Sequence, residues 1–375
     1  MNRVCRGCRS GGLTTVLDLG RQPAGDYFPL IDEPLTGDES GHQLAMDLCP
    51  QCGLAQLATD DTTVQEPRGI EPQALRDQAA DAVARVAAAR LLPAGGTVRE
   101  FPSPHGGSWL PLLSQRGYEV TGGPADVVVD SMGIMHEPDQ HTAFTKRARA
   151  LKPGGVLLIQ FHSLAAILRH QQWNALRHGH FAYYSWASLE RLLTQAGFVA
   201  VGGWEFDLYG GSVLVAARHA AVAQPTGPPF VTLAAIEAAE RAAGVTDARS
   251  LRALADASER GTRILSRWAH RRAAQNKAVY AYGASSRAVS LFAQAGLTSE
   301  VLRGVADAAA AKHGRRMPGT DIPIIAPEEL VRAEPDAVLL TVPDLYDEVC
   351  RSYPQLAPAL MSATRDLTRM ETADA

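Results

Sequence analysis

The chain has no large excess of either charge. Its 375 residues include 36 Lys and Arg against 40 Asp and Glu, for a net charge of −4. A chain this close to neutrality, with a pI of about 6.3, argues against nucleic acid and anionic membranes as bulk partners. No apolar run reaches the roughly 18 residues that a membrane-spanning helix needs. The first residues, MNRVCRGC, also lack the apolar core of a signal peptide, so we expect a cytoplasmic protein.

Cysteine is scarce, with five residues in the whole chain, yet four of them fall into two close pairs. Cys5 and Cys8 are separated by two residues, and so are Cys49 and Cys52. This spacing lets one tight turn direct two sulfur atoms at a single ion, and two such turns complete a tetrahedral zinc site. Four thiolates leave no open position for water or substrate. We therefore predict a structural zinc rather than a catalytic one.

The remaining sequence alternates between strand-like and helix-like segments, which is typical of α/β folds. Residues 127–129 are three consecutive valines, as in a buried parallel strand, and residues 223–229 (AQPTGPP) have the composition of a linker. A second βα pattern begins near residue 277. We predict three domains: a small zinc-binding module at 1–65, a doubly wound Rossmann domain at 66–222, and a helical segment plus a smaller Rossmann-like domain at 223–375.

Several motifs in chain order resemble the bacterial deoxysugar C-methyltransferases that act on nucleotide-linked 4-keto sugars. They are LDLGRQPAGDYF, CPQCGLAQL, LKPGGVLLIQF, LRHGHFAYYSWASLERLL, YGGS, AYGASSRA and MPGTDIPI. They span nearly the whole chain. The resemblance implies a zinc-binding N-terminal domain, a core that binds S-adenosylmethionine (SAM), and a C-terminal Rossmann-like domain. It also implies a nucleotide-linked sugar as partner.

The resemblance assigns the proton-transfer chemistry to a histidine motif. That motif corresponds here to residues 177–180, so His180 matches the general base and His178 its neighbour. A histidine with a pKa near neutrality suits removal of a proton next to a ketone. The chain departs from the motif at two positions, where Gly179 replaces a glutamate and Arg177 an aromatic residue. The alternative is that both histidines are loop residues without a chemical role.

The expected SAM site is altered in two ways. Its first turn keeps Glu100 and Gly106, but prolines at 102 and 104 and His105 replace small or acidic residues, and proline has no N–H to donate. The strand ending near residue 121 is followed almost at once by the next strand. A βαβ-type unit of roughly 30 residues, with the carboxylate that would hold the ribose, is therefore missing. Asp130 is the nearest remaining acid. These changes argue against conventional SAM binding.

The substrate side keeps more of the expected groups. The segment AYGASSRA follows a strand and opens a helix, so its backbone N–H groups are candidates to hold a diphosphate, with Arg287 in reach. The alternative is a tight βα turn that binds nothing. The candidate substrate-binding residues are Tyr184, Tyr209, Ser212, Tyr282, Gly283 and Arg287.

Three functions remain open from the sequence. The first is a C-methyltransferase with a rearranged SAM pocket. The second is a SAM-independent isomerase or epimerase that uses His180. The third is a non-catalytic accessory protein that binds a nucleotide sugar.

Overall fold

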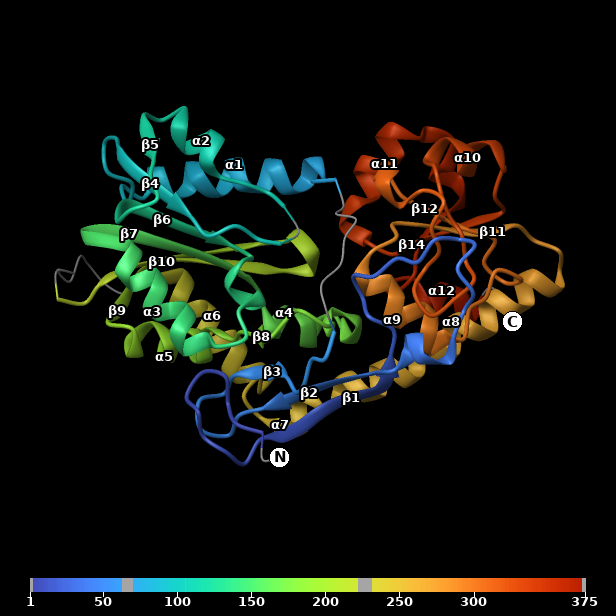
Figure 1. Ribbon diagram of the computed structural model, residues 1–375, viewed down its shortest axis with the longest axis horizontal. Helices are drawn as coiled ribbons and strands as arrows, with labels where there is room; N and C mark the ends of the chain where they lie inside the picture. Colours follow the sequence, from blue (N-terminus) through green and yellow to red (C-terminus); the bar gives the residue numbers. More distant parts are fainter. Residues whose placement is uncertain (1–2, 63–69, 105, 222–230, 373–375) are drawn as a thin grey trace.

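The computed structural model describes residues 3–62, 70–104, 106–221 and 231–372, and it contains three β-sheets (Figure 1). The predicted linker at 223–229 and His105 lie outside the described residues. The α/β fold class predicted from the sequence is confirmed, including the N-terminal cysteine module. No helix among the described residues is both long and apolar enough to cross a bilayer.

The N-terminal sheet is antiparallel, in the order β1-β2-β3-β8. Its strands are β1 (Thr14–Gln22), β2 (His42–Leu48), β3 (Ala55–Leu57) and β8 (Ala182–Tyr183). Strand β8 belongs to the middle of the chain, and it pairs with β3 through Ala55–Tyr183 and Gln56–Ala182. The two strands lie on opposite sides of the predicted domain boundary at residue 65. Their pairing holds the segment that carries His180 against the N-terminal sheet.

The middle sheet has six strands in the order β5-β4-β6-β7-β10-β9. They are β4 (Gly96–Glu100), β5 (Tyr118–Val120), β6 (Ala125–Ser131), β7 (Leu151–His162), β9 (Phe198–Phe206) and β10 (Ser212–His219). Strands β4 to β7 are parallel, and β10 runs antiparallel to both β7 and β9. The KPGG segment (residues 152–155) lies inside β7 as an irregularity, because the register with β6 shifts between Ala125 and Val127.

Helices cover both faces of this sheet, which explains the run of valines at 127–129. Val127 and Val129 pack with α1 (Gln73–Ala88) and α2 (Leu110–Ser114). Val128 packs on the other face with α3 (Gln140–Ala150) and α5 (Trp186–Gln195). Successive strand residues point to opposite faces, so a strand buried on both faces is apolar at every position. Helix α6 (Val231–Ala243) also packs on this second face, beyond the predicted boundary at 222.

Strand β5 is the edge of the middle sheet, and residues 121–124 join it directly to β6. No helix or strand stands between the two within this described segment. The short connection expected from the sequence is therefore present in the fold.

The C-terminal sheet is parallel, in the order β13-β12-β11-β14-β15. Its strands are β11 (Val279–Tyr282), β12 (Val305–Ala306), β13 (Ile324–Ile325), β14 (Ala337–Leu340) and β15 (Leu360–Ser362). The helices of this region are α7 (Ala248–Leu251), α8 (Ala253–Ala274), α9 (Ser286–Ala295), α10 (Pro327–Arg332), α11 (Tyr346–Ser352) and α12 (Leu367–Thr372).

Helix α8 joins the N-terminal sheet to the C-terminal domain. Residues of β1 such as Leu17 share one apolar core with Leu265 of α8 and Phe292 of α9. In Figure 1, β1 and β2 lie along the bottom of the view, beneath both Rossmann-like parts. This common core holds the loop that follows β1 against the beginning of α9.

Candidate functional site

The four paired cysteines form one cluster. Their sulfur atoms all lie within 4.8 Å of one another, with 3.5 Å between Cys5 and Cys52 and 3.6 Å between Cys8 and Cys49. Zn–S bonds of about 2.3 Å in a tetrahedron place sulfur atoms about 3.8 Å apart, so the cluster fits zinc. The backbone N–H groups of Gly7 and Cys8 point at the Cys5 sulfur. The contact with Cys52 lowers the pKa of Cys5 to about 5.

A separate cavity of about 250 Å³ lies at the carboxyl ends of β4, β6 and β7. Ligands of open α/β sheets bind at this edge. All three parts of the chain contribute to its wall, through residues that include Asp26, Ser103, Met132, His180, Tyr209 and Arg287. None of the four cysteines lines it. The cavity is therefore the candidate site for small-molecule chemistry, and the cysteine cluster a structural one.

The segment 177–180 is held tightly at one side of the cavity. The N–H of Gly179 donates to Asp60 (2.7 Å), and the N–H of Arg177 donates to the Tyr183 hydroxyl (3.1 Å). Gly179 has φ of +75°, a conformation that glycine adopts at little cost and glutamate does not. The glycine that replaces the expected glutamate is thus required by this turn.

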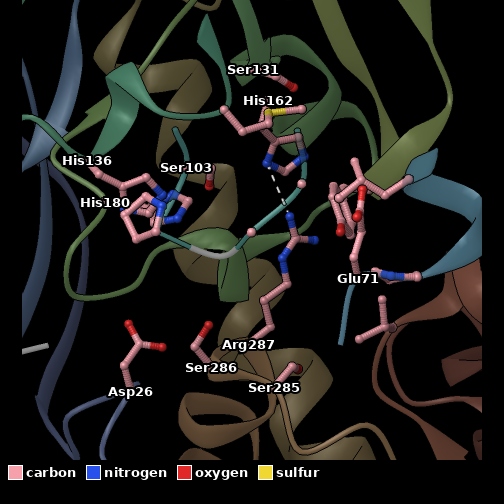
Figure 2. Close-up of a pocket in the computed structure, with 18 of the residues that line it drawn as sticks. Asp26, Glu71, Ser103, Ser131, His136, His162, His180, Ser285, Ser286 and Arg287 are labelled. Carbon is pink, nitrogen blue, oxygen red and sulfur yellow. Dashed lines mark hydrogen bonds between the residues drawn. The ribbon is translucent and has the colours of Figure 1, made fainter. Parts of the chain in front are cut away.

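His180 packs against a second histidine, which the sequence analysis did not single out. The rings of His136 and His180 meet edge to face, with centroids 4.1 Å apart. His136 lies in the short helix η2 (Ile134–His136) after β6, and its Nδ1 donates to the Gly179 carbonyl at 2.8 Å. Burial lowers the pKa of His136 to about 3, so its ring stays neutral. Figure 2 shows the two rings together at the side of the cavity.

Arg177 bridges His180 and the beginning of α9. One guanidinium nitrogen contacts Nε2 of His180, and another donates to the Ser286 hydroxyl at 2.9 Å. Because a guanidinium only donates, Nε2 of His180 is the acceptor and the ring is neutral. His180 is thus in the protonation state of a base, but its lone pair is engaged by Arg177.

Arg287 approaches the cavity from α9 and connects it to the middle sheet. Its guanidinium donates to Nδ1 of His162 at 3.2 Å, drawn dashed in Figure 2. It also lies over the Tyr209 ring, 5.8 Å from the centroid. Burial and the nearby Arg177 lower the pKa of Arg287 to about 10, and burial lowers that of His162 well below its usual value. Among the described residues, no carboxylate forms an ion pair with Arg177 or Arg287.

The beginning of α9 adds donors of its own to this cationic wall. Ser285 caps the helix, and Ala284, Ser285 and Ser286 all line the cavity. Lys312 also lines it, although its ammonium group donates to the Ala284 carbonyl (2.7 Å) and to Asp307 (3.2 Å). Helix N-termini and guanidinium groups together favour a bound anion.

The two carboxylates expected near SAM, Glu100 and Asp130, have partners within the protein. Both carboxylate oxygens of Glu100 are occupied within the loop, by the Ser108 hydroxyl (2.6 Å) and the Trp109 N–H (2.7 Å). Asp130 is fully buried and paired with Arg147 at 2.8 Å, away from the cavity wall. Between β5 and β6 the chain has Thr121, two glycines and Pro124, with no carboxylate. Glu100 and Asp130 are therefore both engaged in contacts within the protein.

The structure brings some of the remaining sequence candidates together and separates others. Gly106, His180, Tyr209 and Arg287 line the cavity, whereas Glu100, Asp130, His178, Tyr184, Ser212, Tyr282 and Gly283 do not. His178 lies against β2, with Nε2 3.3 Å from the Gln43 carbonyl. Tyr184 is buried in the core and donates to Gln140, and Ser212 accepts from Gln160 at 3.1 Å.

Four wall residues were not predicted from the sequence: His136, His162, Asp26 and Lys312. Arg177 was expected only as a departure from a motif. His162 ends β7, and His136 closely follows β6. Polar residues at the carboxyl ends of parallel strands meet at one edge of the sheet, and this signal was available for both histidines. Two non-glycine wall residues, Met132 and Tyr209, also adopt positive φ, of 60° and 56°. Such backbone strain is common at functional sites.

Comparison with known proteins accounts for most of the chain. A putative zinc binding domain matches residues 5–61, a methyltransferase domain matches 113–201, and a C-methyltransferase C-terminal domain matches 207–359. The chain is 28% identical over 385 residues to the C-methyltransferase NovU of Streptomyces niveus, in an alignment that covers 90% of this chain and 88% of NovU.

Solved structures also match the chain in part. A putative methyltransferase from Bacillus halodurans is 14% identical, covers 36% of this chain and 98% of its own, and has a TM-score of 0.30. The magnesium protoporphyrin IX methyltransferase of Synechocystis, solved with bound SAM, is 15% identical, covers 40% of this chain and 86% of its own, and also has a TM-score of 0.30. The chain is therefore similar, in chain order, to a zinc binding domain, a methyltransferase domain and a C-methyltransferase C-terminal domain, and over nearly its whole length to a C-methyltransferase.

Proposed function

We propose that this C-methyltransferase-family protein binds a nucleotide-linked keto-deoxysugar in the cavity and that His180 removes a proton from the carbon next to the ketone. The observation that carries the proposal is the contact between Arg177 and His180 at the cavity wall. It places a neutral imidazole and a positive charge side by side, which is what formation of an enolate requires.

The chemistry follows from the geometry of these two groups. Nε2 of His180 becomes available as a base when Arg177 turns from the imidazole to the ketone oxygen of the ligand. The guanidinium then stabilises the negative charge that develops on that oxygen as the proton leaves the carbon. Arg177 keeps its second anchor on Ser286 throughout, so only one of its two contacts has to change.

The nucleotide part of the ligand would bind at the positively charged part of the cavity wall. Arg287 and the first residues of α9 present donors to the cavity, and the two guanidinium groups of Arg177 and Arg287 lack carboxylate partners among the described residues. Like charges brought together in a half-buried cavity repel each other, and a diphosphate bound at Arg287 would reduce that repulsion.

The proposed proton transfer does not require SAM. The engaged carboxylate of Glu100 and the short connection after β5 support an altered cofactor site in this chain. The same observations favour a second candidate function, a SAM-independent isomerase or epimerase, because proton transfer at His180 needs no methyl donor. The hydrogen bond that occupies Nε2 of His180 favours a third, an accessory protein that binds a nucleotide sugar without turning it over.

One set of experiments separates these functions. The wild-type protein is incubated in D₂O with a nucleotide-linked 4-keto sugar, and deuterium at the carbon next to the ketone is measured by NMR. We expect wash-in, and we expect His180→Ala to slow it by about 10²-fold or more, the typical contribution of a general base. His270→Ala, an exposed position on α8, serves as the matched control and should not change the rate.

The outcomes are distinct. Ligand binding without wash-in contradicts the proton transfer and leaves the accessory function. A methylated product formed on addition of SAM supports the transferase and excludes the isomerase. Calorimetry that detects no heat with millimolar SAM excludes conventional methyl transfer. Deuterium wash-in by a protein that does not bind SAM would support the isomerase.

A further inference from the structure

Asp26 is the carboxylate that the proposed chemistry leaves unused. It lines the cavity, it is half-buried, and it forms no hydrogen bond or ion pair with the residues that the structure describes. A carboxylate that is partly removed from water usually has partners, because burying its charge unpaired is costly. The Asp26 carboxylate in the cavity wall is therefore available to accept a hydrogen bond from a ligand.

The fold fixes where this carboxylate lies. Gly25 approaches α9 so closely that an added Cβ would be 3.3 Å from Cβ of Ser286. This contact presses the loop after β1 onto the beginning of α9 and turns the next residue, Asp26, into the cavity. Figure 2 shows the Asp26 carboxylate and the Ser286 hydroxyl on the same side of the cavity. Ser286 accepts from Arg177, so Asp26 borders the group that also contacts His180.

The charges around Asp26 determine what it can bind. Burial raises its pKa, and the nearby Arg177 and Lys312 oppose that shift by favouring the carboxylate. An ionised carboxylate only accepts hydrogen bonds, and it repels a phosphate. Hydroxyl groups are therefore suitable partners, and the diphosphate is not. In a ligand whose diphosphate lies at Arg287, the groups that face Asp26 are those of the sugar.

We propose that Asp26 is the sugar-recognition residue of this cavity, accepting a hydrogen bond from a ring hydroxyl of the nucleotide-linked sugar. This inference rests on the proposed function and extends it to the hydroxyl groups of the sugar. It predicts that Asp26 distinguishes a nucleotide sugar from the free nucleoside diphosphate. A residue that only shaped the cavity, or only tuned its charge, would not make that distinction.

The test is a calorimetric titration with two kinds of probe. The probes are a panel of nucleotide-linked 4-keto sugars and the matching free nucleoside diphosphates. The proteins are the wild type, Asp26→Ala, Asp26→Asn and, as the matched control, Asp32→Asn at an exposed carboxylate in the same segment. Because Asp26 makes no hydrogen bond with the residues that the structure describes, its variants should keep the melting temperature of the wild type, which is measured first.

For the sugar nucleotide that the wild type binds, we expect Asp26→Ala to weaken binding about tenfold or more, the loss of one hydrogen bond to a charged acceptor. Asp26→Asn, which retains one carbonyl acceptor, should fall between Asp26→Ala and the wild type. The free diphosphate should bind as well as before or more tightly, because a repelling charge has been removed.

Equal weakening of both probes, or no change in either, would overturn the role of Asp26 while leaving the proposed function intact. A wild type that binds no nucleotide sugar would contradict the proposed function itself, and this inference with it.

Discussion

At the level of single residues, the sequence predicts the positions that form a local pattern and not those that depend on long-range contacts. The paired spacing of the cysteines is local, so it predicted the cluster of Cys5, Cys8, Cys49 and Cys52 that the fold assembles. The roles of Arg177 and Asp26 depend on contacts with α9, more than a hundred residues away in the chain. No local pattern encodes such contacts. The expected roles of His180 and Arg287 stay predictions.

The zinc site gives a prediction at this scale. Cys49→Ser should release the metal and lower the melting temperature markedly, because four ligands share the ion and structural zinc contributes directly to folding. Elemental analysis of the purified protein measures the metal per chain. Cys350→Ser is the control, since Cys350 lies outside the cluster and should leave one zinc per chain. Unchanged zinc in Cys49→Ser would contradict a four-cysteine site.

Elements of the middle sheet were predicted well where the apolar pattern of the sequence is strong, as in β6. They were predicted less well where packing between distant segments determines the position of an element. Helix α6 illustrates the second case, since its sequence gave no sign that it covers β9 and α5 rather than the C-terminal sheet. The buried side chain of Glu240 connects α6 to α5. Glu240 of α6 accepts the N–H of Trp186, the first residue of α5, at 2.8 Å with both oxygens. A charged side chain thus caps one helix from another.

This cap predicts a dependence of stability on pH. Burial raises the pKa of Glu240 to about 7, while the N–H groups of Trp186 and Ala187 oppose the shift. The folded protein therefore holds this proton more tightly than the unfolded chain, so the contribution to stability is full below about pH 4.5 and is lost as the pH rises through 7. Glu240→Gln removes this titration. The unfolding free energy of the variant, relative to that of the wild type, should therefore increase by up to about 3 kcal/mol from pH 4.5 to pH 7.5.

Urea denaturation of both proteins at a series of pH values measures this difference directly. Parallel pH profiles for the two proteins would contradict the assignment to Glu240.

The whole molecule is held together by contacts between parts that the sequence predicted as separate domains. Arg316 of the C-terminal domain is 2% exposed and pairs at 2.5 Å with Glu39, which follows the loop after β1. Gly319 also donates to Glu39 at 3.0 Å. Although burial opposes it, these donors lower the pKa of Glu39. The pair therefore anchors the N-terminal module, and with it the loop that carries Asp26, to the C-terminal domain.

Breaking this pair should be costly. Glu39→Gln leaves the Arg316 charge buried without its partner, and we expect a loss of about 3–5 kcal/mol in the free energy of unfolding. Asp81→Asn is the matched control, because its partner Arg85 lies on the same exposed helix face and such pairs contribute about 0.5 kcal/mol or less. Equal effects of the two substitutions, measured by denaturant titration, would contradict a structural role for the buried pair.

The cavity wall draws on all three sheets and their loops, and this has a consequence for how the protein can be handled. A fragment cut at either predicted boundary would lose Asp26 or Arg287 from the enclosure, so no isolated piece should retain the ligand affinity of the intact chain. A ligand bound in the cavity would instead link the three parts. Their melting temperatures should then rise together when the ligand is added.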